Sequence, residues 1–303
     1  MEPYPLPQKD NISFAFGKFL ELKHPIAVDK RIYSPDHRLA FHKHDFPQIW
    51  YCIDGNYLHF VEDAVIPCQK GSFLVIPAGV RHRFQIPQGA QAELASVNIS
   101  YDALTEDNAC YLNTMVNLFL PAFSKELGHS FPVCRLLSPR SQAATEEYLS
   151  WLALLRFTPT DMFSTADSYK KLEEIFSLPE LALPSQFRKR ALQLIQTRLC
   201  PILRMLCYLN IHYPEKIAEE ALLQKIGISR AGMYRYFKQY MGYTYSQYLQ
   251  RLRVARANVY LMYTNYSISC ISDMCGFYDT HHMTKAMSRY LGQTPGRKRA
   301  RKK

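Results

Sequence analysis

The sequence predicts an α+β protein of two parts: an N-terminal antiparallel β-barrel with flanking helices, then a C-terminal all-α domain with two helix-turn-helix units. Three observations support this. The 303 residues are about twice a typical domain. Short apolar segments separated by turn residues fill positions 32 to 98. Helical spacing takes over from Tyr101, and a two-helix pattern then occurs twice, about 50 residues apart.

The charge is divided unevenly along the chain. The 37 Lys and Arg against 26 Asp and Glu give +11. Residues 1–185 carry −5 and residues 186–303 carry +16. An excess of this size indicates an anionic partner, either nucleic acid or a membrane surface. We therefore expect the basic half to bind a polyanion and the acidic half to have another task.

Several classes of protein are disfavoured early. The apolar runs are too short to span a bilayer, and the N-terminus lacks the basic start and apolar stretch of a signal peptide. Eight scattered cysteines form no Cys-x-x-Cys pair, which is typical of free thiols in a reducing compartment. We expect a cytoplasmic protein that does not bind membranes.

The N-terminal half contains six predicted strands with no helix between them, which is the pattern of an antiparallel sandwich or barrel. Asp54-Gly55-Asn56 separates two apolar runs and predicts a β-hairpin. The strands are expected at Ala40–His44, Gln48–Ile53, Tyr57–Val61, Gly71–Ile76, His82–Ile86 and Ala92–Asn98.

Two motifs in these strands predict a polar pocket. His42, His44, Gln48 and Trp50 lie at even spacing, so they share one face, and His82 follows a Pro-Gly turn that can bring it to them. The motifs, His-x-His-x3-Gln and Gly-x5-Pro-x-Gly-x2-His, resemble those of the cupin barrel over residues 35–90.

The resemblance also bears on metal binding. In metal-binding cupins three histidines and a glutamate hold a divalent cation, whereas this chain has Gln48 at the glutamate position. Because a neutral amide is a poorer ligand, we expect no metal and no cofactor. The five residues are instead expected to hydrogen-bond a small polar effector, with a carbohydrate as the first candidate. Two alternatives stay open: the side chains only satisfy one another, or they hold a catalytic metal.

The middle of the chain predicts a helix beginning near Ser141. Tyr148, Trp151, Leu152 and Leu155 form one apolar stripe on it. The stripe either packs against the barrel or forms the interface of a homodimer. Residues 141–195 are accordingly predicted to be a helical dimerisation and linker region.

Each repeat of the C-terminal pattern has a short helix ending at a glycine, Gly227 or Gly276, followed by a helix with a good N-cap, Ser229 or Asp279. This predicts two helix-turn-helix units, at about residues 215–242 and 264–292. A helix with apolar spacing from Tyr248 to Val259 would connect them.

Residues 196–299 resemble the DNA-binding domain of the AraC/XylS family of bacterial transcription regulators. The resemblance rests on Ser229-x3-Met233-x3-Phe237-Lys238-x3-Gly242, on Ser267-Ile268-x2-Ile271-x4-Gly276-Phe277 and on Gly292-x-Thr294-Pro295. It implies a ligand-sensing barrel at 1–140 and a DNA-binding domain at 196–303. It also implies that the second helix of each unit enters the major groove of double-stranded DNA.

The resemblance assigns the outward positions of these helices to base reading, and Arg235 and Lys285 have the chemistry to contact guanine. The base readers are expected to be Ala231, Tyr234, Arg235, Thr280, His281, Thr284 and Lys285. The phosphate contacts are expected from Arg230, Lys238, Arg251 and Arg289.

We therefore expect a non-enzymatic, effector-controlled DNA-binding regulator. It would act as a homodimer with RNA polymerase as a partner, and it would be associated with the nucleoid when bound to DNA. The alternative is a metal-dependent cupin enzyme that a basic domain holds on DNA. A regulator with a vestigial pocket is the weaker third hypothesis.

Overall fold

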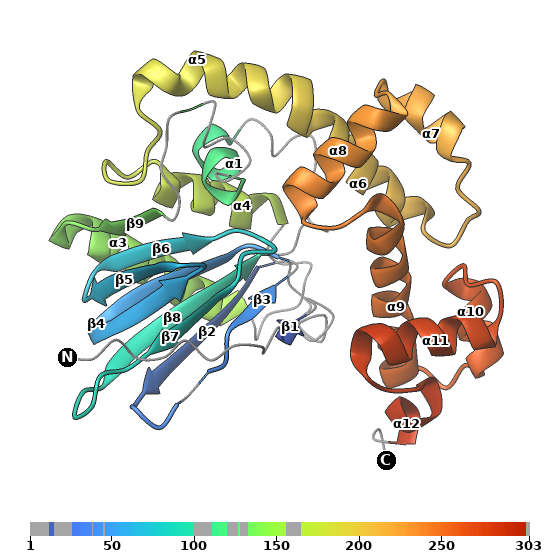
Figure 1. Cartoon of the computed structure of the whole chain (residues 1–303), viewed down its shortest axis with the longest axis horizontal. Coiled ribbons are helices and arrows are strands. Elements are labelled where there is room, and N and C mark those ends of the chain that lie inside the picture. The colour runs from blue at the N-terminus through green and yellow to red at the C-terminus, as the bar shows by residue number, and fades with distance from the viewer. Residues whose placement is uncertain are drawn as a thin grey trace.

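The computed structural model describes residues 12–14, 26–37, 39–44, 46–99, 111–119, 127, 133–155 and 165–300. An antiparallel β-domain is followed by a helical C-terminal part, as the sequence predicts (Figure 1). The strands are β1 (Ile12–Phe14), β2 (Ile26–Tyr33), β3 (His42–His44), β4 (Gln48–Val61), β5 (Ala64–Gln69), β6 (Ser72–Ile76), β7 (His82–Gln85), β8 (Ala92–Ile99) and β9 (Val133–Leu136). The helices are α1 (Leu112–Leu118), α3 (Pro139–Leu155), α4 (Thr165–Phe176), α5 (Ser185–Leu194), the π-helical turn η4 (Ile195–Leu199), α6 (Cys200–His212), α7 (Glu219–Ile226), α8 (Arg230–Met241), α9 (Tyr245–Tyr263), α10 (Ile268–Met274), α11 (Thr280–Leu291) and α12 (Pro295–Ala300).

Strand β4 joins the two halves of the β-domain. Its first part pairs with β6 and β8, and its second part pairs with β5 and β7. Apolar side chains from both halves, including Trp50, Leu74 and Phe84, form one buried cluster between them. The polar pocket lies beside this cluster because the alternation of β4 turns Gln48 and Trp50 to the same side.

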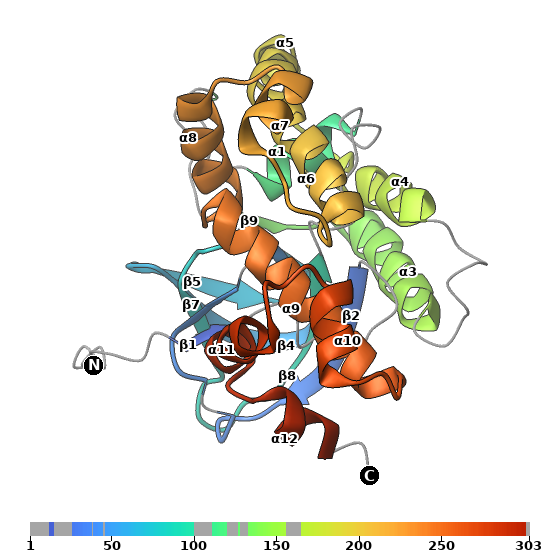
Figure 2. The same cartoon turned by 90° about the vertical axis from the view of Figure 1, so that its right-hand side faces the viewer.

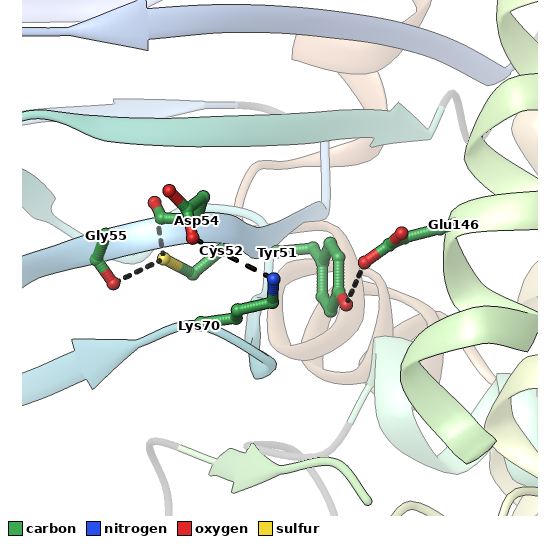
Figure 3. Close-up of polar contacts among 6 residues, drawn as sticks. All are labelled: Tyr51, Cys52, Asp54, Gly55, Lys70 and Glu146. Atoms are coloured by element: carbon green, nitrogen blue, oxygen red, sulfur yellow. Dashed lines mark hydrogen bonds and ion pairs between the residues drawn. The ribbon is translucent and has the colours of Figure 1, made fainter. Parts of the chain in front are cut away.

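The predicted hairpin at residues 54–56 is wrong. The chain does not reverse there: β4 continues through a register shift between Cys52 and Asp54. Gly55 has φ +82°, and a Cβ there would lie 2.2 Å from the Gln91 carbonyl oxygen. The turn residues mark a β-bulge, which needs the same left-handed glycine as a hairpin. Figure 3 shows the bulge, where the Cys52 thiol donates to the Asp54 and Gly55 carbonyls and Lys70 pairs with Asp54.

Four strands fall outside the six predicted ones: β1, β2, β5 and β9. β1 pairs with β3 in parallel, and β9 pairs antiparallel with β6. β2 pairs with β8 along its whole length, from Ile26 opposite Ile99 to Tyr33 opposite Ala92. β5 follows β4 directly, with Val61 opposite Ala64. β5 was not predicted from the sequence because it contains Pro67. Proline is disfavoured in strands except at edges and bulges.

Helix α3 packs on the β-domain through the predicted apolar stripe. Tyr148 and Leu152 are buried, and Trp151 is half-buried against the same core. The Tyr51 hydroxyl of β4 donates to Glu146 of α3 at 3.1 Å (Figure 3). The structure thus supports packing against the barrel as the role of this stripe.

A continuous helical run, α5–η4–α6, leads from the β-domain region to the first helix-turn-helix unit (Figure 1). Its middle turn is π-helical, with the Cys200 N–H donating to the Ile195 carbonyl. Pro201 follows at the start of α6. Proline has no N–H and cannot give the usual bond to the carbonyl four residues back, so a wide turn is tolerated at this point.

The capping residues predicted from sequence are confirmed. The side chains of Ser229 and Asp279 accept the backbone N–H groups of Gly232 and His282 at the starts of α8 and α11. Gly227 ends α7 in the left-handed conformation, with φ +75°. The connecting helix, predicted from Tyr248 to Val259, is the longer α9, which begins with a capping box at Thr244.

The first helix-turn-helix unit shares one buried core with the β-domain. This core runs from Ile26 of β2 to Leu252 of α9 and includes Tyr240 and Met241 at the end of α8. The Phe119 ring meets Tyr240 edge-on at 5.9 Å. The second unit has a separate cluster, centred on Met283 and Met287. Figure 2 shows α10 and α11 at the far end of α9 from α8.

Across the described ranges, every helix is too short or too polar to cross a bilayer.

A glycine comparison tests the contact between the two units. Gly276 has φ +72°, and a Cβ there would lie 2.4 Å from the Pro214 carbonyl oxygen. Gly227 has φ +75° with nothing within 4 Å of such a Cβ. We expect Gly227→Ala to cost about 1 kcal/mol from backbone strain alone. Gly276→Ala should cost roughly 2 to 3 kcal/mol, because backbone must also move. Chemical unfolding of both variants measures this, and equal losses would contradict the contact.

Candidate functional sites

The five residues predicted to line the pocket lie together inside the β-domain. The His42 ring centroid is 4.9 Å from that of His44 and 4.4 Å from that of His82, and all three residues are buried. His42 and His82 face each other across β3 and β7. The ligand nitrogens of the three lie within 4.8 Å of one another. That the group binds an effector stays a prediction.

Gln48 links the histidines to the wall of the pocket. Its Oε1 accepts the Trp50 indole N–H at 2.6 Å and lies 3.2 Å from Nε2 of His82. Its Nε2 donates to Oδ1 of Asn98 at 2.7 Å. All these side chains are buried. The network fixes the direction of the Gln48 amide, since an indole nitrogen only donates.

Burial keeps the imidazoles neutral. It lowers the pKa of His44 to about 2, with further lowering from the nearby His82 and His42 rings. Burial also lowers the pKa of His82 to about 3. The pKa of His42 is lowered for the same reason, against an opposing bond to the Ala40 carbonyl. The pocket therefore presents uncharged nitrogen lone pairs near neutral pH.

Sequence reasoning missed two members of the pocket. His59 is fully buried on β4, its ring stacks on His82 at 5.5 Å, and neither ring nitrogen has a hydrogen-bond partner. Asn98 on β8 pairs with Gln48 across the strands. The even spacing of Tyr57, His59 and Val61 would have revealed His59, but the predicted turn at Asp54–Asn56 broke that alternation. Nothing local marks Asn98, which is 50 residues from its partner.

A short loop connects the pocket to the DNA-binding part. The Gly79 N–H donates to the His44 carbonyl at 2.7 Å. A Cβ added to Gly79 would contact Cα of Gly242, which ends α8, at 3.8 Å. Gly79 therefore lies between the backbone of His44 and the end of α8, the first recognition helix.

The predicted base readers of the first unit are on the exposed face of α8. Ala231, Tyr234 and Arg235 are exposed there, while Met233 and Phe237 are fully buried. Two of the exposed side chains have partners within the domain: the Tyr234 hydroxyl donates to Glu219, and Arg235 donates to the Tyr236 hydroxyl at 2.6 Å.

The second unit shows the same division on α11. The four predicted readers, Thr280, His281, Thr284 and Lys285, are exposed or half-exposed on one side. Met283 and Met287 face the core with no exposure. The structure brings each predicted set to one helix face, and the contacts with bases remain predictions.

The predicted phosphate-binding residues divide into two kinds. Arg230, Lys238 and Arg289 are exposed. Arg230 pairs with Glu219 and Glu220 at the start of α7. Arg251 is half-buried, with its guanidinium 5.1 Å from the Tyr243 ring centroid and 5.2 Å from that of Tyr290. Arg251 thus also bridges the two units.

Comparisons with known proteins match both parts of the chain. Residues 30–109 match the family model described as an AraC-like ligand binding domain. Residues 222–301 match the model of a helix-turn-helix domain. The two together cover more than half of the chain, and they contain all five pocket residues and all eleven predicted DNA contacts.

Two similar proteins align with this chain over nearly their whole length. The HTH-type transcriptional activator RhaR of Mannheimia succiniciproducens is 25% identical over 93% of this chain and 94% of its own. The HTH-type transcriptional activator RhaS of Citrobacter koseri is 23% identical over 90% and 91%. Among solved structures, apo ToxT K231A of Vibrio cholerae aligns over 90% of this chain and 96% of its own, at 10% identity and a TM-score of 0.48.

RhaR and RhaS are named as transcriptional activators, which disfavours the cupin-enzyme hypothesis. With both family models matched in the order that the sequence predicts, the chain belongs to the AraC family of transcription regulators, with an AraC-like ligand-binding domain and a helix-turn-helix DNA-binding domain.

Proposed function

We propose that this protein is a DNA-binding transcription regulator whose affinity for its operator is set by a small polar effector in the β-domain. One observation carries the proposal: a cluster of buried polar side chains in the β-domain and two helix-turn-helix units with exposed polar faces occur in one chain. The charge of +16 in residues 186–303 favours binding to a polyanion.

The proposed DNA contacts use the exposed side of α8 and α11. Arg235 is the strongest candidate for a bidentate contact with guanine. Its guanidinium donates to the hydroxyl of the neighbouring Tyr236, near the helix surface. Lys238 and Arg289 would contact phosphates and fix the position of the units without reading sequence.

The proposed effector is a hydroxyl-rich metabolite, such as a sugar. Neutral imidazoles suit hydroxyl groups better than charged ligands. A ligand that displaces His44 would act on the Gly79 N–H bond, and hence on the contact with Gly242 at the end of α8. The effector has to bind one arrangement of the units more tightly than the other, and DNA would then alter effector affinity reciprocally.

We further propose that the protein is a cytoplasmic activator that functions as a homodimer and contacts RNA polymerase. Support for activation comes from the names of the RhaR and RhaS relatives. The proposed parts are a sensing domain at 1–140, a linker and dimerisation region at 141–195 and a DNA-binding domain at 196–303.

The first test concerns sequence reading. Arg235→Ala should remove the preference for one base pair, worth about 1 to 3 kcal/mol, because only that contact is lost. Selection of bound sites from random DNA by both proteins measures this. Uniformly weaker binding to all sequences would instead identify Arg235 as a phosphate contact.

The matched control is on the same helix. Lys238→Ala should weaken binding to all sequences alike and reduce the slope of log affinity against log salt by about 1, because one phosphate contact fewer releases fewer counterions. Binding isotherms at several salt concentrations give this slope. An unchanged slope would show that Lys238 contacts no phosphate.

The effector proposal is tested by thermal unfolding with a panel of sugars and related metabolites. A ligand at 100 times its Kd should stabilise the folded chain by about 2.7 kcal/mol, because it binds only that state. Gln48→Leu should abolish the shift. If no compound of a broad panel raises the Tm, the carbohydrate proposal fails, and the DNA-binding proposal stands unaffected.

A further inference from the structure

Cys68 and Cys134 lie on edge strands that belong to different halves of the β-domain. Cys68 is on β5, which pairs with the second part of β4, and Cys134 is on β9, which pairs with β6. Within the described ranges, neither β5 nor β9 has a second pairing partner. Side chains, and not backbone hydrogen bonds, therefore join these two strands where they meet.

Both thiols belong to the apolar cluster between the two halves. Cys68 is a buried member of it, and Cys134 packs against it while half-buried. A hydrogen bond joins the two thiols. Disulfide formation requires the sulfur atoms to come still closer, and rotation of the two side chains supplies such a movement. The pair is thus placed for a covalent bond across the two halves.

The two thiols differ in reactivity. The Cys68 S–H donates to the Cys134 sulfur, and this bond lowers the pKa of Cys134 against the effect of burial, with further lowering from the charge of Arg135. The same bond, together with burial, raises the pKa of Cys68. Because the thiolate is the form that attacks an oxidant, Cys134 reacts first. The buried Cys68 is in position to react second.

We propose that Cys68 and Cys134 are a redox-active pair, which a peroxide converts to an intramolecular disulfide bond. In the first step the Cys134 thiolate attacks one oxygen of hydrogen peroxide, the O–O bond breaks, and a sulfenic acid and hydroxide form. In the second step the Cys68 sulfur loses its proton and attacks the Cys134 sulfur, the S–O bond breaks, and water leaves. The two thiols together lose two electrons and two protons, and the peroxide becomes two molecules of water.

The position of the bond connects it with the polar pocket. Leu74 of β6 is opposite Cys134 on one side and opposite Trp50 of β4 on the other. The Trp50 indole N–H in turn donates to Gln48. A bond from Cys134 to Cys68 fixes this row of side chains to strand β5 of the other half. The inference adds a response to oxidants to the proposed function, and it requires neither effector binding nor DNA binding.

A third thiol in the same cluster serves as the matched control. The Cys52 S–H donates to the Asp54 and Gly55 carbonyls (Figure 3). Burial raises the pKa of Cys52 to about 12, so little thiolate is present near neutral pH. Cys52 thus shares the surroundings of the pair and lacks its activated sulfur.

The test uses the full chain, first reduced and then treated with hydrogen peroxide. The number of thiols that a maleimide labels after denaturation should fall by two from the eight of the sequence. Digestion without reductant, followed by mass spectrometry, should give one linked peptide pair, with Cys68 joined to Cys134. Cys68→Ser and Cys134→Ser should each abolish this pair, whereas Cys52→Ser should retain it. In the untreated folded chain, iodoacetamide should label Cys134 at least about 10-fold faster than Cys52.

Several outcomes would overturn the redox pair. They are a wild-type chain that keeps all its thiols, a linked peptide pair of other cysteines, and bonds only between separate chains. Cys134→Ser keeps the test decisive if Cys68→Ser does not fold, because Cys134 is only half-buried. Cys68 should stay a thiol in that variant, and its oxidation at the wild-type rate would show that Cys134 does not react first. Effector and operator binding are measured separately, so their failure would count against the proposed function alone.

Discussion

The end of α8 is buried against the β-domain, and this packing determines where both helix-turn-helix units stand. Tyr240 and Met241 belong to the same core as the strands, and Phe119 packs on Tyr240. The second unit has its own core and reaches the rest through α9 and the loop at Pro214. The first unit is therefore in direct contact with the β-domain core, and the second is joined to it through these connections.

Local features were predicted well because their causes are local. A glycine with φ above zero ends a helix, and a serine or aspartate begins one, so Gly227, Ser229 and Asp279 identify the units without tertiary information. The exposed and buried faces of α8 and α11 likewise follow from helical periodicity.

The predictions were wrong or incomplete where contacts between residues far apart in the sequence decide which of two local structures forms. The turn residues at Asp54–Asn56 allow a hairpin or a bulge, and pairing with β8 selects the bulge. The pocket residues were found by their even spacing, yet Asn98 and the shared acceptor of Gln48 depend on strand register. The sequence left open whether the apolar stripe of α3 packs on the barrel or forms a homodimer interface. Its partner, the β-domain, lies far away in sequence.

The rigidity of α9 has a consequence for the spacing of the operator. The helix has 19 residues and a length of about 28 Å, close to one turn of B-form DNA. Arg251, stacked between Tyr243 and Tyr290, further fixes the rotation of one unit relative to the other. A single residue inserted into α9 would turn the second unit by about 100° around the helix axis. The rotation that α9 sets between the two units, as much as the identity of its side chains, thus decides whether both units can face the same side of a duplex.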